Sequence, residues 1–159
     1  MWAARAGLGQ NASMAEQATE TLEIAASAET ILAVLLDFDA YPTWARDLKG
    51  VTVDSRDDEG RAREVTFRAA AMGRSTSYTL RYEYGDDPTR IGWELVRGDI
   101  MRRLDGSYVL EPAPGGRGTH VTYHLSVELI VPLPGFVKRR AETKIIHTAL
   151  RELRGHVEG

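Results

Sequence analysis

The stretch THVTYHLSVELIVPLPGFVKRRAETKIIHTALRELRGHV, residues 119–157, changes its pattern of hydrophobicity partway along. Residues 119–129 alternate between apolar and polar side chains, which is typical of a strand with one buried face. Two prolines then end the strand pattern, because proline cannot donate a backbone hydrogen bond to a sheet. Over residues 135–157 the apolar side chains recur at helical spacing and predict a long amphipathic helix. We expect its buried stripe to consist of Val137, Ala141, Ile145, Ile146, Ala149, Leu150, Leu153 and Val157.

The segments before this stretch also alternate with a period of two. They include REVTFRAAA (63–71), TSYTLRYEY (76–84) and RIGWELV (90–96), which short turns rich in Gly, Asp or Pro separate. Successive strands joined by short turns predict an antiparallel meander of about six strands, with one buried face and one exposed face. TETLEI (19–24) adds a strand ahead of the meander. The long final helix is the element that can cover the buried face.

Two shorter helices are predicted between the first strand and the meander. Ser27 is a good N-cap, and apolar residues follow it at helical spacing until the helix ends near Asp37. Pro42 can open a second, short helix, because the first helical position needs no N–H. The same proline favours an extended backbone at Tyr41. We expect Trp44 and Leu48 to form an apolar pair on this short helix.

The resulting order is strand, helix, short helix, meander and long helix, which defines an α+β fold. We expect a curved antiparallel sheet of about six to seven strands wrapped on the C-terminal helix. Residues 18–159 form a single domain in this interpretation, and residues 1–17, which are unpatterned, form a flexible N-terminal extension. A chain of 159 residues suits one domain.

Four segments of the chain resemble the START-like helix-grip (SRPBCC) superfamily, in particular its polyketide cyclase/dehydrase and lipid-transport branch. They are FDAYPTW (38–44), WELVRGDIMRRLDGSYVLEP (93–112), GTHVTYHLSVELIVPLPG (118–135) and RRAETKIIHTALRELRGHVEG (139–159). The resemblance covers residues 19–159. It implies a cavity for a hydrophobic ligand under the long helix, and it implies no single ligand or reaction.

Composition excludes several other functions. The net charge of −3 is not typical of a nucleic-acid-binding protein, and no apolar run is long enough to span a bilayer. The chain contains no cysteine, which agrees with a cytoplasmic location and excludes sulfur-based metal sites. Its four histidines lack metal-binding spacing, and no Ser-His-Asp arrangement or phosphate-binding loop is present. We therefore expect no metal and no cofactor.

Aromatic side chains gather on the predicted inner face of the sheet. Large rings fill the core of many proteins, but each buried tyrosine hydroxyl needs a hydrogen-bond partner. A ligand or water in a cavity would supply these partners. Trp44 is predicted to close the cavity from inside, while Tyr41 packs nearer the surface. The predicted ligand-binding residues are Trp44, Phe67, Tyr78, Tyr82, Trp93, Tyr108, Tyr123, Phe136 and Arg140.

Three cations, Lys138, Arg139 and Arg140, begin the long helix, where they oppose the helix dipole. One interpretation is a solvated surface with Glu142 as a partner. A second is that Arg140 binds an anionic headgroup or carboxylate near the mouth of the pocket. A third is transient contact with an anionic membrane.

Three functional hypotheses follow from these patterns. The first is binding or transport of a small hydrophobic ligand that is lipid-, isoprenoid- or polyketide-like. The second is a polyketide cyclase or dehydratase in which Tyr78, Tyr108 or Arg140 polarises a carbonyl. The third is a toxin-like or regulatory protein that binds a partner with the outer face of the sheet. The inward strand positions contain no His or carboxylate that could act as a base, which favours a binding protein over an enzyme. The oligomeric state is not specified by these patterns.

Overall fold

The computed structural model describes residues 17–71, 74–85, 89–131 and 133–159. The expected N-terminal extension lies outside the described residues except for Gln17. Seven strands form one sheet in the order β1-β7-β6-β5-β4-β3-β2, and all neighbours are antiparallel. The strands are β1 (Ala18–Ile24), β2 (Leu48–Arg56), β3 (Ala62–Ala71), β4 (Arg74–Tyr84), β5 (Arg90–Gly98), β6 (Met101–Pro112) and β7 (Thr119–Leu129).

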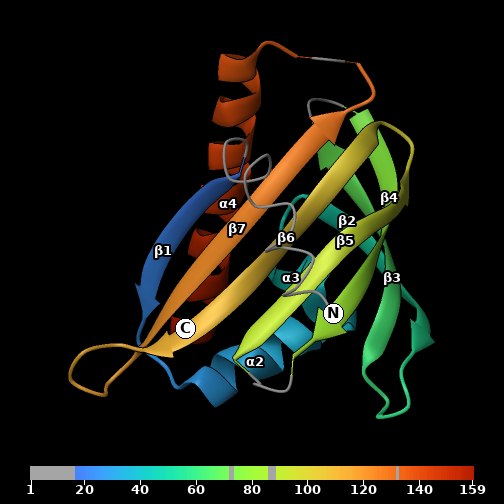
Figure 1. The fold of residues 1–159 in the computed structure, drawn as a ribbon. Coiled ribbons are helices and arrows are strands. Elements are labelled where there is room, and N and C mark those ends of the chain that lie inside the picture. Colours follow the sequence, from blue (N-terminus) through green and yellow to red (C-terminus); the bar gives the residue numbers. More distant parts are fainter. Residues whose placement is uncertain (1–16, 72–73, 86–88, 132) are drawn as a thin grey trace.

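The meander from β2 to β7 follows the order of the chain, and β1 returns to pair with β7. Alternation along β7 is as predicted, because Val121, Tyr123 and Leu125 are buried whereas Thr122 and His124 are only partly so. Figure 1 shows the sheet curving from β1 round to β2. The predicted α+β fold, with a curved antiparallel sheet and a long C-terminal helix, is therefore confirmed.

The first helix, α2 (Ala28–Leu36), begins and ends where the sequence predicts. The Ser27 side chain accepts a hydrogen bond from the backbone N–H of Thr30 at 3.1 Å, which is a standard N-cap. Asp37 caps the C-terminal end. A short 3-10 helix (Phe38–Ala40) then leads directly into α3 (Tyr41–Trp44).

Two details of this segment differ from the expectation. Tyr41 has a helical backbone (φ −51°, ψ −43°), not an extended one, although it precedes a proline. Its hydroxyl donates to the carbonyl of Leu35, which holds the turn back against α2. Since α3 ends at Trp44, Leu48 lies in β2, and the predicted Trp44–Leu48 helical pair is wrong.

The long helix α4 (Gly135–Glu158) lies over β1 and β7 (Figure 1). Its C-terminal half contacts α2 and α3, where Glu158 accepts from the N–H of Ala25 and Glu152 from the N–H of Arg46. We call this region the closed end of the fold. The opposite region, where α4 begins after β7, is called the open end.

The buried face of α4 differs in two positions from the predicted stripe. Ile146, Leu150 and Leu153 are buried as predicted, but Ile145 is 41% exposed. Glu142, predicted to be a surface partner, is fully buried. Because Glu142 lies four residues before Ile146, both side chains project from the same side of the helix.

Candidate functional site

The inner face of the sheet holds a connected cluster of aromatic rings. Phe38, from the turn after α2, is central to it, because its ring lies 4.7 Å from that of Tyr82 and 5.1 Å from that of Tyr41. Trp93 and Tyr108 continue the cluster across β5 and β6 at a ring separation of 5.4 Å. Such separations are typical of favourable aromatic pairs. We call this set the aromatic interior: Phe38, Tyr41, Phe67, Tyr78, Tyr82, Trp93, Tyr108 and Tyr123.

Six of the nine predicted ligand-binding residues belong to the aromatic interior: Phe67, Tyr78, Tyr82, Trp93, Tyr108 and Tyr123. Trp44 borders it, since its ring lies 5.0 Å from that of Tyr41. Phe136 does not join them, because it is 62% exposed at the start of α4. Arg140 is exposed as well. Ligand contact by these nine residues remains a prediction.

Trp44 lies at the closed end beside the long helix, where its ring stacks on His156 at 6.0 Å. Its Nε1 is sealed from solvent and has no hydrogen-bond partner in the ranges that the structure describes. Tyr41 is not nearer the surface than Trp44, because the two are 9% and 8% exposed. Tyr41 faces the rings of Phe38 and Phe67, so it belongs to the interior.

Four tyrosine hydroxyls in the aromatic interior make no hydrogen bond within the part of the chain that the structure describes. The hydroxyls of Tyr41 and Tyr84, by contrast, donate to the carbonyls of Leu35 and Ala62 at 2.5 and 2.6 Å. Among the described residues, the sealed side-chain polar atoms without a partner are Trp44 Nε1 and Glu142 Oε1. The four tyrosine hydroxyls are unpaired but are not sealed, so each must border a space large enough for a water molecule. The four residues are Tyr78, Tyr82, Tyr108 and Tyr123.

Burial raises the pKa of Tyr82, Tyr108 and Tyr123 well above 10, and neighbouring tyrosines raise it further. Tyr41 and Tyr108 both raise the pKa of Tyr82 through their charge, and Tyr78 raises that of Tyr123. Such mutual effects are expected for hydroxyls that lie near one another in surroundings of low polarity. These tyrosines are therefore neutral at pH 7 and can act as hydrogen-bond donors.

Glu142 joins α4 to β7. The backbone N–H of Val127 donates to its Oε2 at 2.8 Å, and Lys138 Nζ lies 3.5 Å from the same oxygen. Val127 lies beyond Leu125, which pairs with Ala18, the first residue of β1. The Glu142 carboxylate therefore accepts a hydrogen bond from the N–H of Val127, which lies beyond the part of β7 that pairs with β1. Its other oxygen, Oε1, is sealed and unpartnered.

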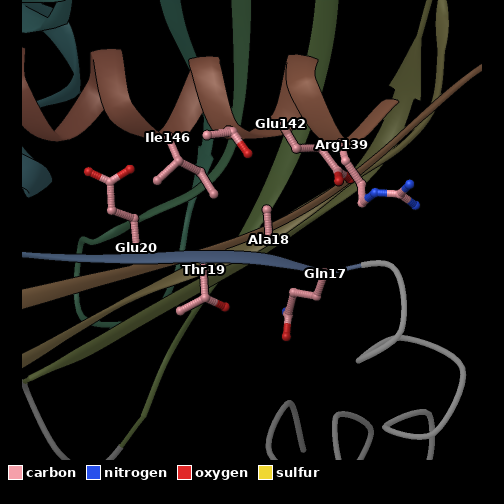
Figure 2. A pocket seen from close by; sticks show the side chains of 8 residues that line it. Gln17, Ala18, Thr19, Glu20, Arg139, Glu142 and Ile146 are labelled. Atoms are coloured by element: carbon pink, nitrogen blue, oxygen red, sulfur yellow. The ribbon is translucent and has the colours of Figure 1, made fainter. Parts of the chain in front are cut away.

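A hollow of about 200 Å³ lies between β1 and α4, next to Glu142 (Figure 2). A shallower hollow of about 480 Å³ lies on the outer side of α4 and is lined by Arg139, Arg140, Thr143, Lys144 and His147. None of the interior aromatics lines either of these two hollows. The first is lined by Gln17, Ala18, Thr19, Glu20, Arg139, Glu142, Thr143 and Ile146.

Sequence reasoning missed the roles of Phe38, Tyr41 and Glu142. Phe38 was detectable, because it follows Leu35 by three residues and so continues the apolar spacing of Ile31 and Leu35 past the end of the helix. Glu142 was detectable as the position four residues before Ile146, but its charge pointed to the surface.

Within the described residues, neither a metal-binding cluster nor a membrane-spanning helix is found. No group of three or more His, Asp or Glu side chains there is arranged to hold a metal ion. Of the helices in those same ranges, none has the length and hydropathy to cross a membrane.

The fold and the aromatic interior define a helix-grip protein, in which a curved antiparallel sheet closes on a long C-terminal helix. The sequence matches the polyketide cyclase/dehydrase and lipid transport family over residues 15–158, and the chain belongs to this family. No curated protein sequence matches the chain.

Solved structures share this fold. A START superfamily protein from Mycobacterium smegmatis is 28% identical, with a TM-score of 0.84 over 89% of this chain and 97% of that one. An aromatase/cyclase from a Streptomyces species is 15% identical, with a TM-score of 0.73 over 89% and 93% of the two chains. A STAR-related lipid transfer protein fragment from Xanthomonas axonopodis is 20% identical, with a TM-score of 0.67 over 90% and 86%. The last two likenesses show the fold alone.

Proposed function

We propose that the protein binds a small hydrophobic ligand in the aromatic interior, between the sheet and α4. The observation that carries this proposal is the set of four tyrosine hydroxyls that have no partner among the described residues. Leaving such a group unpaired in an apolar interior costs about 1–3 kcal/mol. A ligand with an apolar body and one or more oxygens would satisfy them.

The chemistry of the interior narrows the class of ligand. Rings dominate the lining, so a flat or chain-like apolar molecule would fit against them. The neutral tyrosines donate hydrogen bonds, so the ligand should carry carbonyl, hydroxyl or ether oxygens. Lipid-, isoprenoid- and polyketide-like molecules have both features. The family to which the chain belongs includes lipid transport and polyketide cyclisation in its description.

A cyclase or dehydratase is the second candidate, because neutral tyrosines can polarise a carbonyl. A base is also needed for such chemistry. Of the carboxylates and histidines that the structure describes, Glu142 alone is buried, and it is bonded to the N–H of Val127. Arg140, which was predicted to assist, is exposed. These facts favour binding over catalysis.

Ligand binding can be tested with the purified protein by native mass spectrometry and by titration with a quinone analogue and a fluorescent fatty acid. Trp93, which contacts Tyr82, Tyr108 and Tyr123, should report binding through its fluorescence. Tyr108→Phe combined with Tyr123→Phe should weaken binding of an oxygen-bearing probe about tenfold, since a neutral hydrogen bond contributes about 0.5–1.5 kcal/mol. Tyr84→Phe is the matched control, because its hydroxyl already donates to Ala62.

Two outcomes would contradict the proposal. One is a protein that carries no co-purified ligand and binds neither probe. The other is a double variant that binds the oxygen-bearing probe as tightly as the parent protein. A polyketide cyclisation rate that falls in the double variant would instead support the second candidate.

A further inference from the structure

The exposed hydrophobic side chains of the protein lie close together. Among the described residues, every exposed large hydrophobic side chain lies between positions 130 and 145. Four of them occupy the passage from β7 into α4, and we call these the apolar tip: Ile130, Val131, Leu133 and Phe136, which are 48%, 70%, 37% and 62% exposed. A group of exposed apolar side chains in one short segment indicates a surface that another body covers.

Cations lie directly beside the apolar tip. We call Arg139, Arg140 and Lys144 the cationic rim; all three are exposed, and in the described part of the chain none forms an ion pair. Arg140 follows Phe136 by four residues, about 6 Å along the helix axis, and Lys144 by about 12 Å. The first turns of a helix disfavour cations, so an external anion would stabilise this arrangement.

The sequence around the tip is also one-sided in charge. Between Leu129 and Ala141 it contains no Asp or Glu, although the whole chain carries a net charge of −3. The positive charge is therefore local and is not a property of the surface as a whole. The three rim residues line the shallow hollow on the outer side of α4.

We propose that the apolar tip inserts into the headgroup region of an anionic lipid bilayer, while the cationic rim contacts lipid phosphates. Apolar side chains flanked by Arg and Lys are the combination that binds such an interface. A second copy of the chain fits less well, because symmetric contact through the tip would bring the two cationic rims together. This inference rests on the proposed function, since it supplies a route for a hydrophobic ligand.

Docking in this orientation presents the open end of the fold to the membrane. The closed end, where α2 and α3 contact α4, then lies away from it (Figure 1). Ile145, one turn before Ala149, is exposed on α4 between the tip and the closed end. A ligand that leaves the bilayer would thus meet the less covered part of the helix first.

The test is co-sedimentation of the full chain with two kinds of vesicle, phosphatidylcholine alone and phosphatidylcholine mixed with phosphatidylglycerol. We expect binding to the mixed vesicles only, and weaker binding as the salt concentration rises. The double variant Arg139→Glu, Lys144→Glu should bind at least about 25-fold more weakly, at about fivefold for each cation removed. Val131→Ser with Leu133→Ser should weaken binding about tenfold or more.

The matched control is the double variant Arg63→Glu, Arg117→Glu, which changes the net charge by the same amount. Both residues are exposed, and they lie in β3 and in the β6–β7 turn, away from the start of α4 (Figure 1). This control should bind mixed vesicles within about twofold of the parent protein, because screening limits the effect of distant charges.

Several results would overturn the inference. They are no binding to either vesicle, equal binding to both, an equal loss in the control variant, or a dimer in solution that the tip variants abolish. Retention of an acidic protein partner through the rim, without vesicle binding, would overturn it too. Probe binding in solution by the same variants separates this inference from the proposed function, because the tip and rim variants should bind the quinone analogue normally.

Discussion

The two ends of α4 are held in different ways. At the closed end, the side chains of Glu152, His156 and Glu158 all bind or stack on the segment between β1 and β2. At the open end, Phe136 is 62% exposed, and Glu142 supplies the hydrogen bond to β7. One helix thus combines a fixed end with an end whose apolar side chains face outward. The exposed side chains of the open end should therefore matter for contact with other molecules more than for stability, whereas the buried Glu142 should contribute to stability.

The largest difference between the ends should appear in paired truncations of phenylalanine. Phe38→Ala removes the central ring of the aromatic interior and should lower the free energy of unfolding by about 3–5 kcal/mol. Phe136→Ala removes an exposed ring and should change it by less than about 0.5 kcal/mol. Urea unfolding followed by circular dichroism measures both. Similar losses for the two variants would show that the apolar tip is packed in solution.

An intermediate effect is expected at Glu142, which holds the open end. Glu142→Ala leaves the buried N–H of Val127 unpaired and should cost about 1–3 kcal/mol of unfolding free energy. Glu142→Gln keeps an acceptor oxygen at the same place and should retain much of that stability. Thr143→Ala, at the exposed neighbouring position, is the control. If the Ala and Gln variants at Glu142 are equally unstable, the charge matters and not the hydrogen bond to Val127.

The smallest effect is expected at the closed end, at Glu152. Its Oε2 accepts from the N–H of Arg46 at 3.3 Å near the surface. Glu152→Ala should therefore cost about 0.5–1.5 kcal/mol. It should also speed amide hydrogen exchange at Arg46 while leaving Val127 protected. Equal acceleration at Arg46 and Val127 would mean that the two ends open together, which would remove the distinction between them.

Much of the fold could be predicted because its signals are local. Ser27 as an N-cap, the alternation through Tyr123 and Leu125, and the spacing of Ile146, Leu150 and Leu153 all depend on neighbours within a few positions. Six of the interior aromatics were assigned to the inner face for the same reason, since a period of two places them on one side of a strand. Their contact with a ligand remains a prediction.

Other features depended on contacts that the periodicity of the sequence does not record. The Tyr41 backbone is helical although Pro42 follows it, and the Tyr41 hydroxyl holds the turn against α2 by donating to Leu35. Phe136 was predicted inside from its type alone, but no element in the described part of the chain covers the first turn of α4, where it is 62% exposed.

The sequence by itself determined the elements, the face of each strand that is buried and the place where a sheet gives way to a covering helix. Only the tertiary structure decided that Glu142 is buried and that the apolar tip is exposed. The physical reason is that periodicity indicates which face of a segment is buried. The burial of Glu142 and the exposure of the apolar tip depend instead on where a different segment ends. The paired part of β1 begins at Ala18, so the N–H of Val127 has no partner in β1 and donates to Glu142 instead. The apolar tip is exposed because α2 and α3 contact only the far end of α4.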